Sequence, residues 1–228
     1  MEAFHIKSLS TYYRFILADV CKFDKILYLD CDIIVNSSLS TLFNTNIENY
    51  YFAGVEDVYC KENCERLNLS QYCNAGVMLI NLNLWRKNAI KEKLFNWVLN
   101  NKEKIKWVDQ DVINSVLQDK ILYLNDKFNT QVSVLEFGKT KDNNKKACQS
   151  SIIHFVGCEK PWQKKNFVLY KYYWKYILKL PGQYSWKWAY VKYQIKHFRK
   201  FIVQLKIGKT EQYLRIFNFT IFEYKRSL

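Results

Sequence analysis

In the segment Ile26-Leu27-Tyr28-Leu29-Asp30-Cys31-Asp32-Ile33-Ile34-Val35, two acidic residues interrupt an apolar run. An apolar run rich in β-branched residues is typical of a buried strand, so Asp30 and Asp32 are expected at the C-terminal end of that strand. Open α/β sheets bind their ligands at this edge. Two carboxylates this close together repel each other and lose hydration unless a cation lies between them. The segment therefore predicts a divalent-metal site.

The composition indicates an α/β fold around this site. With 228 residues, 49% of them hydrophobic, the chain can bury a substantial core and has room for one domain and an appendage. Only two prolines and six glycines argue against a loop-rich β-sandwich, and windows rich in Lys, Leu and Asn favour helices around a modest sheet. We expect helices over residues 10–21, 82–100 and 107–117, and strands over residues 26–29, 51–55, 75–80, 121–124 and 151–156.

The C-terminal part of the chain differs sharply in charge from the rest. Residues 1–158 carry a net charge of +1, whereas residues 159–228 carry +13 and contain 19 of the 39 aromatic residues. We therefore expect two parts, a domain over residues 1–160 and a basic, aromatic tail over residues 161–228, with a polar surface loop over 139–146. From residue 166 onward the pattern is typical of helices, with a turn at Pro181-Gly182 and a break near Gly208.

The tail is expected to bind an anionic membrane surface. Helices with Lys on one side and aromatic residues on the other can lie in the membrane interface. One alternative is that the aromatic residues pack the tail onto the domain. A second alternative is binding of nucleic acid, which has the same charge pattern, but no recognisable motif is present and we expect no nucleic-acid partner. No secretory signal precedes the first strand, and no apolar run approaches the ~20 residues of a spanning helix. The expectation is a cytoplasmic protein, peripheral at the inner face of the membrane.

Seven cysteines without a CxxC pair indicate reduced thiols, as in cytoplasmic proteins. The spacing of Cys60, Cys64 and Cys73 is compatible with part of a zinc site, but a fourth ligand is not evident. We favour the interpretation that they are small buried side chains.

Four segments occur in an order that resembles a known family, with Ser10-Thr11-Tyr12-Tyr13-Arg14-Phe15 upstream. They are Tyr28-Leu29-Asp30-Cys31-Asp32, Asn74-Ala75-Gly76-Val77-Met78-Leu79-Ile80-Asn81, Asp109-Gln110-Asp111-Val112-Ile113-Asn114 and His154-Phe155-Val156-Gly157-Cys158-Glu159-Lys160-Pro161-Trp162. Over residues 10–162 the chain resembles glycosyltransferase family 8, the retaining transferases that include bacterial lipopolysaccharide galactosyl- and glucosyltransferases. The resemblance implies a GT-A fold, a Mn²⁺ or Mg²⁺ site, a UDP-hexose donor and a lipid-linked oligosaccharide acceptor.

The resemblance also implies roles for single residues. It makes Asp30, Asp32 and His154 the metal ligands, and carboxylate and imidazole ligands suit Mn²⁺. It makes Arg14, Gly157 and Lys160 the contacts to the donor and its diphosphate. The alternatives are a capped strand end for the acidic pair, a core histidine for His154 and a solvated helix charge for Arg14.

For the sugar end, the resemblance implies Asn74, Asp109 and Gln110, with Asp57 near the acceptor. Gln110 matches the position nearest the reacting face, and because an amide is a poor nucleophile we favour attack by the acceptor on the same face as the leaving group. Asp109 would bind donor hydroxyls and Asn74 would orient the sugar. The alternatives are helix capping for Asp109 and a tight backbone approach around Asn74.

One departure from the family leaves two functions open. Only 29 residues precede Asp30, whereas family members usually carry a longer segment that holds the nucleotide base. The resemblance is therefore to a domain that lacks its N-terminal part, and the chain is either an active transferase or an impaired remnant that binds a membrane or partner. A haloacid-dehalogenase-type phosphatase also places Asp-x-Asp after a strand, but Ile34 stands where Thr or Val is expected and no later Gly-Asp-x-x-x-Asp follows.

Overall fold

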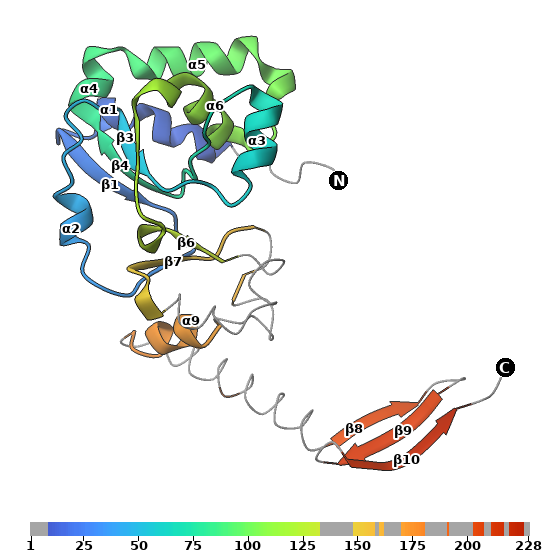
Figure 1. Cartoon of the computed structure of the whole chain (residues 1–228). Coiled ribbons are helices and arrows are strands. Elements are labelled where there is room, and N and C mark those ends of the chain that lie inside the picture. The colour runs from blue at the N-terminus through green and yellow to red at the C-terminus, as the bar shows by residue number, and fades with distance from the viewer. Residues whose placement is uncertain are drawn as a thin grey trace. The chain divides into compact units, whose positions relative to one another are not determined.

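The computed structural model describes residues 9–132, 148–157, 160–161, 170–180, 191, 203–207, 211–216 and 219–225. The chain divides into two compact units, Met1–Lys160 and Pro161–Leu228, which are described separately (Figure 1). The expected loop over 139–146 lies outside the described residues, as do the turn at Pro181-Gly182 and the break at Gly208.

The first unit is built on a four-stranded mixed sheet in the order β1-β4-β3-β5. Its strands are β1 (Lys25–Leu29), β4 (Val77–Asn81), β3 (Phe52–Gly54) and β5 (Ile121–Tyr123). Strand β4 runs antiparallel to both β1 and β3, and β3 runs parallel to β5. The central strands β3 and β4 are almost entirely buried, whereas all five residues of β1 are half-buried. The expected α/β class is confirmed.

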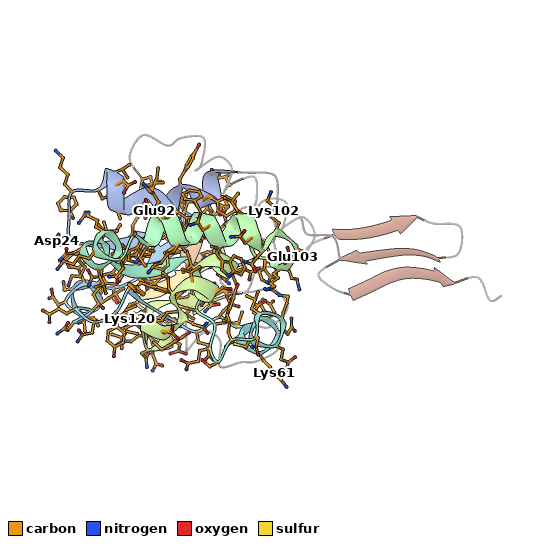
Figure 2. The ribbon with its side chains drawn as sticks, turned by 90° about the horizontal axis from the view of Figure 1, so that it is seen from above. Asp24, Lys61, Glu92, Lys102, Glu103 and Lys120 are labelled. Carbon is orange, nitrogen blue, oxygen red and sulfur yellow. The ribbon has the colours of Figure 1, made fainter. Side chains whose placement is uncertain are left out.

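Alternation along β4 divides the core between the two faces of this sheet. Met78 and Ile80 pack with the helices in the largest apolar cluster, whereas Val77 and Leu79 pack in the smaller clusters that include Leu42 and Ile47. The elements of the larger cluster lie together on one side of the sheet in Figure 1: η1 (Leu9–Ile16), α1 (Leu17–Val20), α4 (Leu82–Lys87), α5 (Ile90–Asn100) and α6 (Val108–Leu117). The exposed charged residues labelled in Figure 2 lie on the outside of the unit: Asp24, Lys61, Glu92, Lys102, Glu103 and Lys120.

A second, three-stranded sheet brings a distant histidine to the acidic pair. Its order is β2-β7-β6, with β2 (Ile33–Val35) antiparallel to β7 (Ile152–His154) and β7 parallel to β6 (Thr130–Gln131). Asp30 and Asp32 lie in the short connection between β1 and β2, and the register pairs Ile33 with His154. The amide of Phe155 donates to the carbonyl of Asp32 at 3.0 Å. Pairing of strands more than 100 residues apart therefore places His154 beside Asp32.

Several elements differ from the sequence expectations in detail. The expected helix over 82–100 is two helices, because Ala89 adopts a left-handed conformation with φ +49° between α4 and α5. The expected helix over 10–21 is a 3-10 helix over Leu9–Ile16 that continues as the short helix α1. Among the described residues of the first unit, the elements that were not predicted are α2 (Ser40–Phe43), α3 (Cys60–Leu67), η2 (Lys102–Lys104), η3 (Gln118–Lys120), η4 (Asp126–Phe128) and the strands β2 and β6.

The second unit contains strands where the sequence predicted helix. Helix α9 (Tyr170–Ile177) agrees with the expectation, but residues 203–207, 211–216 and 219–225 form the antiparallel sheet β10-β9-β8, so the prediction of helix there is wrong (Figure 1). Its strands are β8 (Val203–Ile207), β9 (Glu211–Ile216) and β10 (Phe219–Lys225). Val203, Leu205 and Ile207 alternate with polar residues, the period of a strand. Among the described residues, no helix has the length and hydropathy needed to cross a bilayer.

Candidate functional site

One cavity of about 390 Å³ collects residues from six separate parts of the first unit. Side chains reach it from η1, the β1–β2 connection, the segments before α3 and before β4, the start of α6, and the residues after β7. All nine site residues expected from the sequence line it: Arg14, Asp30, Asp32, Asn74, Asp109, Gln110, His154, Gly157 and Lys160. Asp57, expected near the acceptor, lines it as well.

The acidic pair and His154 form the strongest candidate for a metal site. The ligand atoms of Asp30, Asp32 and His154 all lie within 4.8 Å of one another, and in the described part of the chain no other His, Cys, Asp or Glu group meets this condition. The Oδ1 atom of Asp32 is buried and makes no hydrogen bond to a described residue, although His154 Nε2 lies only 3.2 Å away. A buried carboxylate oxygen without a donor, beside a second carboxylate and an imidazole, fits a divalent cation.

Two basic side chains border this cluster. Lys160 Nζ donates to Asp32 Oδ2 at 2.5 Å and to the Phe155 carbonyl at 2.6 Å. Arg14 lies 3.2 Å from Asp30 Oδ1 and 2.9 Å from Asp109 Oδ2, and its guanidinium stands 4.5 Å above the ring of Tyr28. Arg14 and Lys160 both line the cavity, and each pairs with one carboxylate of the acidic pair. Their positive charges could therefore attract an anion to the cavity.

The half-buried Asp32 and the buried Asp109 have opposite pKa shifts. Burial raises the pKa of Asp32, but His154 and Lys160 lower it by more, so that it lies well below its usual range. For Asp109, burial raises the pKa, and the charge of Arg14 with the hydrogen bond from Thr11 only partly offsets this. Ionised Asp32 is thus stabilised by its neighbours, whereas ionised Asp109 carries a desolvation cost.

The shift at Asp32 predicts an acid-dependent loss of stability in the metal-free protein. Because its pKa is lowered by folding, ionised Asp32 stabilises the fold above the unfolded-state pKa of about 3.9, and this contribution is lost as the pH falls below that value. Urea unfolding of the protein and of Asp32→Asn across this range should show their stability difference shrinking as the pH falls. Parallel pH profiles would contradict the assignment.

Two other residues that line the cavity, Asn74 and Gln110, are held by Asp57. Asp57 Oδ2 accepts from Asn74 Nδ2 at 2.9 Å and from Gln110 Nε2 at 3.2 Å. The Oε1 atom of Gln110 accepts from the amide of Ala75 at 2.9 Å. The Gln110 amide is therefore fixed at both of its polar atoms, facing the cavity between the metal cluster and Asp57.

The start of α6 is anchored by a fully buried carboxylate, Asp111. Its oxygens accept from Arg66 at 2.6 Å, from the Tyr72 hydroxyl at 2.6 Å, and from the amides of Lys106 and Trp107 at 2.7 Å. Val108, the next residue, has φ +46°, a strained conformation for a β-branched residue. These bonds hold the turn that presents Asp109 and Gln110 to the cavity.

Gly76 allows the backbone before β4 to lie close to the side chains of Asp30 and His154. Its carbonyl accepts from the Asp30 amide at 2.8 Å, and a Cβ at this position would lie 2.2 Å from His154 Cε1 and 2.8 Å from Asp30 Oδ2. Gly157, after β7, has φ +82° with open space around it, so its glycine is required by the backbone conformation rather than by crowding.

Gly76→Ala is expected to cost about 1–3 kcal/mol of stability and to weaken Mn²⁺ binding, because His154 and Asp30 must move away from the new methyl group. Gly54→Ala is the matched control, since its Cβ would meet the sulfur of Cys73 at 2.5 Å outside the cavity. Unfolding and Mn²⁺ titration should show both variants destabilised and only Gly76→Ala impaired in binding. Equal Mn²⁺ affinity in the two would contradict this role.

The sequence reasoning missed three residues of the site. The Thr11 hydroxyl donates to Asp109 Oδ1, and the Tyr28 hydroxyl donates to Asp30 Oδ1 at 2.9 Å. Asn129 Oδ1 lies 3.0 Å from His154 Nδ1. Thr11 and Tyr28 belong to the segments that resemble the family, so the sequence could have indicated them as site residues. No motif in the sequence around Asn129 indicates a functional role.

The cysteines remain free thiols where the structure describes them. Cys60 and Cys64 approach each other to 3.4 Å on α3, and the buried thiol of Cys73 donates to the Val55 carbonyl at 3.2 Å. They do not form a three-ligand cluster within the described residues, which favours their interpretation as small packed side chains.

Comparison with known proteins agrees with the resemblance. A putative glycosyltransferase of Haemophilus influenzae is 34% identical over 165 residues, and the match covers 69% of this chain and 50% of that protein. A lipopolysaccharide 1,3-galactosyltransferase of Salmonella typhimurium is 33% identical over 165 residues, covering 67% of this chain and 49% of the relative. The chain thus spans about half the length of these relatives.

Solved structures of glycosyltransferases have a similar fold. The crystal structure of the galactosyltransferase LgtC, in complex with donor and acceptor sugar analogues, superimposes with a TM-score of 0.66 at 24% identity, covering 80% of this chain and 71% of that one. The first unit therefore has the GT-A fold. The model of the family described as "Glycosyl transferase family 8" matches residues 3–166, most of the chain. With the motifs, the fold and the family model in agreement, this chain belongs to glycosyltransferase family 8.

Proposed function

We propose that the protein is a retaining, metal-dependent hexosyltransferase that moves galactose or glucose from a UDP-sugar to a lipopolysaccharide or lipooligosaccharide acceptor. The observation that carries the proposal is the convergence of Asp30, Asp32 and His154 with Arg14 and Lys160 around one cavity. A lipopolysaccharide 1,3-galactosyltransferase among the relatives supports the choice of sugar and acceptor class.

In this proposal Asp30, Asp32 and His154 hold Mn²⁺ or Mg²⁺. The bound cation would supply a Lewis acid that neutralises charge on the departing diphosphate. The buried Oδ1 of Asp32, which lacks a hydrogen-bond donor among the described residues, supports this role because it leaves a ligand atom ready.

Lys160 and Arg14 would bind the diphosphate. The Lys160 ammonium already lies at the rim of the cluster on Asp32, and as a point charge it can turn to a phosphate oxygen without a fixed angle. Gly157 lacks a side chain in the open space beside it, so the backbone there can approach the phosphates. Asp109, buried against Arg14 and Thr11, would accept hydrogen bonds from donor hydroxyls.

Retention of configuration is best served by attack on the front face. A double displacement needs a free nucleophile, but Asp57 accepts from two amides and Asp109 pairs with Arg14. The Gln110 amide is bound at both ends and is itself a poor nucleophile. The acceptor hydroxyl would therefore attack beside the leaving group, and the departing diphosphate would take its proton.

The test is the stereochemistry of turnover. We expect the protein with Mn²⁺ to release sugar from UDP-galactose or UDP-glucose, with proton NMR showing the α-anomer first. Gln110→Ala should slow the reaction while Mn²⁺ affinity stays unchanged, since Gln110 does not bond the metal cluster. Initial release of the β-anomer would exclude a retaining mechanism.

The second candidate is an impaired remnant that acts through the basic tail. It is favoured by the net charge of +13 over residues 159–228. Under the proposed function, the same tail would hold the enzyme at the anionic inner face of the cytoplasmic membrane. Sedimentation with anionic and neutral vesicles tests the tail, and vesicle binding without any Mn²⁺ or UDP binding would favour the remnant.

A further inference from the structure

The side chain behind His154 is Asn129, which lies between η4 and β6. It is only 1% exposed and does not line the cavity, so it is out of reach of a substrate. Its amide bridges two residues of the site. Oδ1 lies 3.0 Å from His154 Nδ1, and Nδ2 donates to Asn74 Oδ1 at 2.9 Å. Asn129 therefore connects the metal end of the cavity with the sugar end.

The direction of these hydrogen bonds is fixed by neighbouring groups that can only donate or only accept. The backbone amide of Gly76 can only donate, and it lies 3.1 Å from Asn74 Oδ1. On its other side, Asn74 Nδ2 faces the Asp57 carboxylate, which also receives the Tyr59 amide and the Gln110 side chain. These neighbours require the Asn74 oxygen to face Asn129.

The orientation of Asn74 then determines which atoms of Asn129 and His154 donate and which accept. Because Asn129 must donate to the Asn74 oxygen, its own oxygen faces His154 Nδ1. That oxygen can only accept, so Nδ1 must carry a proton. In the neutral imidazole the other nitrogen, Nε2, then has a free electron pair. Nε2 faces Asp32 Oδ1 at 3.2 Å and Asp30 Oδ2 at 3.9 Å.

We propose that Asn129 is a positioning residue that fixes the Nδ1-protonated tautomer of His154 and so leaves Nε2 as the ligand atom for a divalent cation. The inference rests on the metal site of the proposed function. In this tautomer the electron pair of Nε2 lies 3.2 Å from Asp32 Oδ1, so that the two atoms can bind the same cation. Two carboxylates and an imidazole electron pair then face one point, which only a cation satisfies.

The tautomer can be observed directly in the metal-free protein. The chain has three histidines, so ¹⁵N-histidine spectra can be assigned by comparison with His5→Gln, His154→Gln and His197→Gln. In its neutral form, His154 should show a protonated Nδ1 and a bare Nε2. Added Mg²⁺ should shift the Nε2 resonance and leave the Nδ1 proton in place. A neutral His154 protonated at Nε2 would overturn the proposal.

Two substitutions separate positioning from packing. Asn129→Leu keeps the volume but removes the acceptor, so the His154 tautomers should mix and Mn²⁺ affinity should fall by about 10- to 100-fold. Asn129→Asp keeps an oxygen facing Nδ1 and should retain the Nδ1-protonated tautomer. Asn114→Leu is the control, because it removes another fully buried amide, one bonded to the backbone of Cys73 and Gln110. It should lower stability without changing the tautomer.

These readouts need neither donor nor acceptor, so a failure of sugar transfer alone leaves the inference standing. Unchanged tautomer and unchanged Mn²⁺ affinity in Asn129→Leu would overturn it. Should that variant not fold, the spectrum of the unmodified protein and that of Asn129→Asp decide the question, and loss of the Nδ1-protonated form in Asn129→Asp counts against it.

Discussion

Asp32→Asn is expected to weaken Mn²⁺ binding by more than about 100-fold, because residues that merely support a metal ligand already cost 10- to 100-fold when changed. Asp32 supplies a buried carboxylate oxygen with no hydrogen-bond donor among the described residues. The asparagine side chain lacks the negative charge that attracts the cation, and its NH₂ group cannot serve as a metal ligand. The free Mn²⁺ signal in electron paramagnetic resonance titrations measures the affinity.

The control for this substitution is Asp19→Asn. Asp19 is an exposed partner of Lys91 on the surface of the first unit, so the Asp19→Asn protein should bind Mn²⁺ with the same affinity as the unmodified protein. Unfolding curves should accompany both titrations, since Asp32 also pairs with Lys160. A folded Asp32→Asn protein with unchanged affinity would remove the acidic pair from the metal site.

Asp111→Asn is expected to cost about 3–5 kcal/mol of stability, the range for breaking a buried ion pair by removing one partner. All four donors to Asp111 would lose their charged acceptor, and the NH₂ group of the new side chain would face donors where a carboxylate oxygen had accepted. The turn at Val108 would lose its anchor, so donor binding through Asp109 should weaken as well. Urea unfolding and titration with UDP-galactose measure the two effects.

Asp119→Asn provides the comparison, because Asp119 is exposed just after the same helix and its change should stay within about 0.5 kcal/mol. A loss below about 1 kcal/mol in Asp111→Asn would mean that the buried network does not hold the start of α6.

The first unit was largely predictable because its strands are continuous apolar runs and its site residues lie at their ends. Asp30 and Asp32 follow β1 as expected, and the apolar run before Asn81 forms the buried strand β4. The metal cluster needed His154 as well, and its approach depends on the pairing of β2 with β7. No local pattern encodes that pairing, so the family resemblance, rather than periodicity, connected His154 to the acidic pair.

Other features lay beyond sequence reasoning for identifiable reasons. Asn129 acts through the direction of its amide, which only the surrounding hydrogen bonds reveal. Ala89 breaks a helical pattern without a glycine or proline to mark the break. In residues 203–225, the basic and aromatic content of the tail drew attention to amphipathic helices, although Val203, Leu205 and Ile207 follow the strand period.

The site as a whole is a closed arrangement of opposite charges and directed hydrogen bonds. Arg14 and Lys160 balance the carboxylates of Asp30, Asp109 and Asp32. A cation and a diphosphate would enter this arrangement as an added pair of opposite charges. For this reason we expect UDP and Mn²⁺ to bind cooperatively, each strengthening the other.

The most direct test of this account is a crystal structure of the protein grown with Mn²⁺ and UDP, with data collected to locate manganese by its anomalous scattering. The account predicts an anomalous peak in contact with Asp30, Asp32 and His154 Nε2, with the diphosphate beside Lys160. An anomalous peak elsewhere, or a diphosphate bound in the cavity with no manganese at these three side chains, would contradict it.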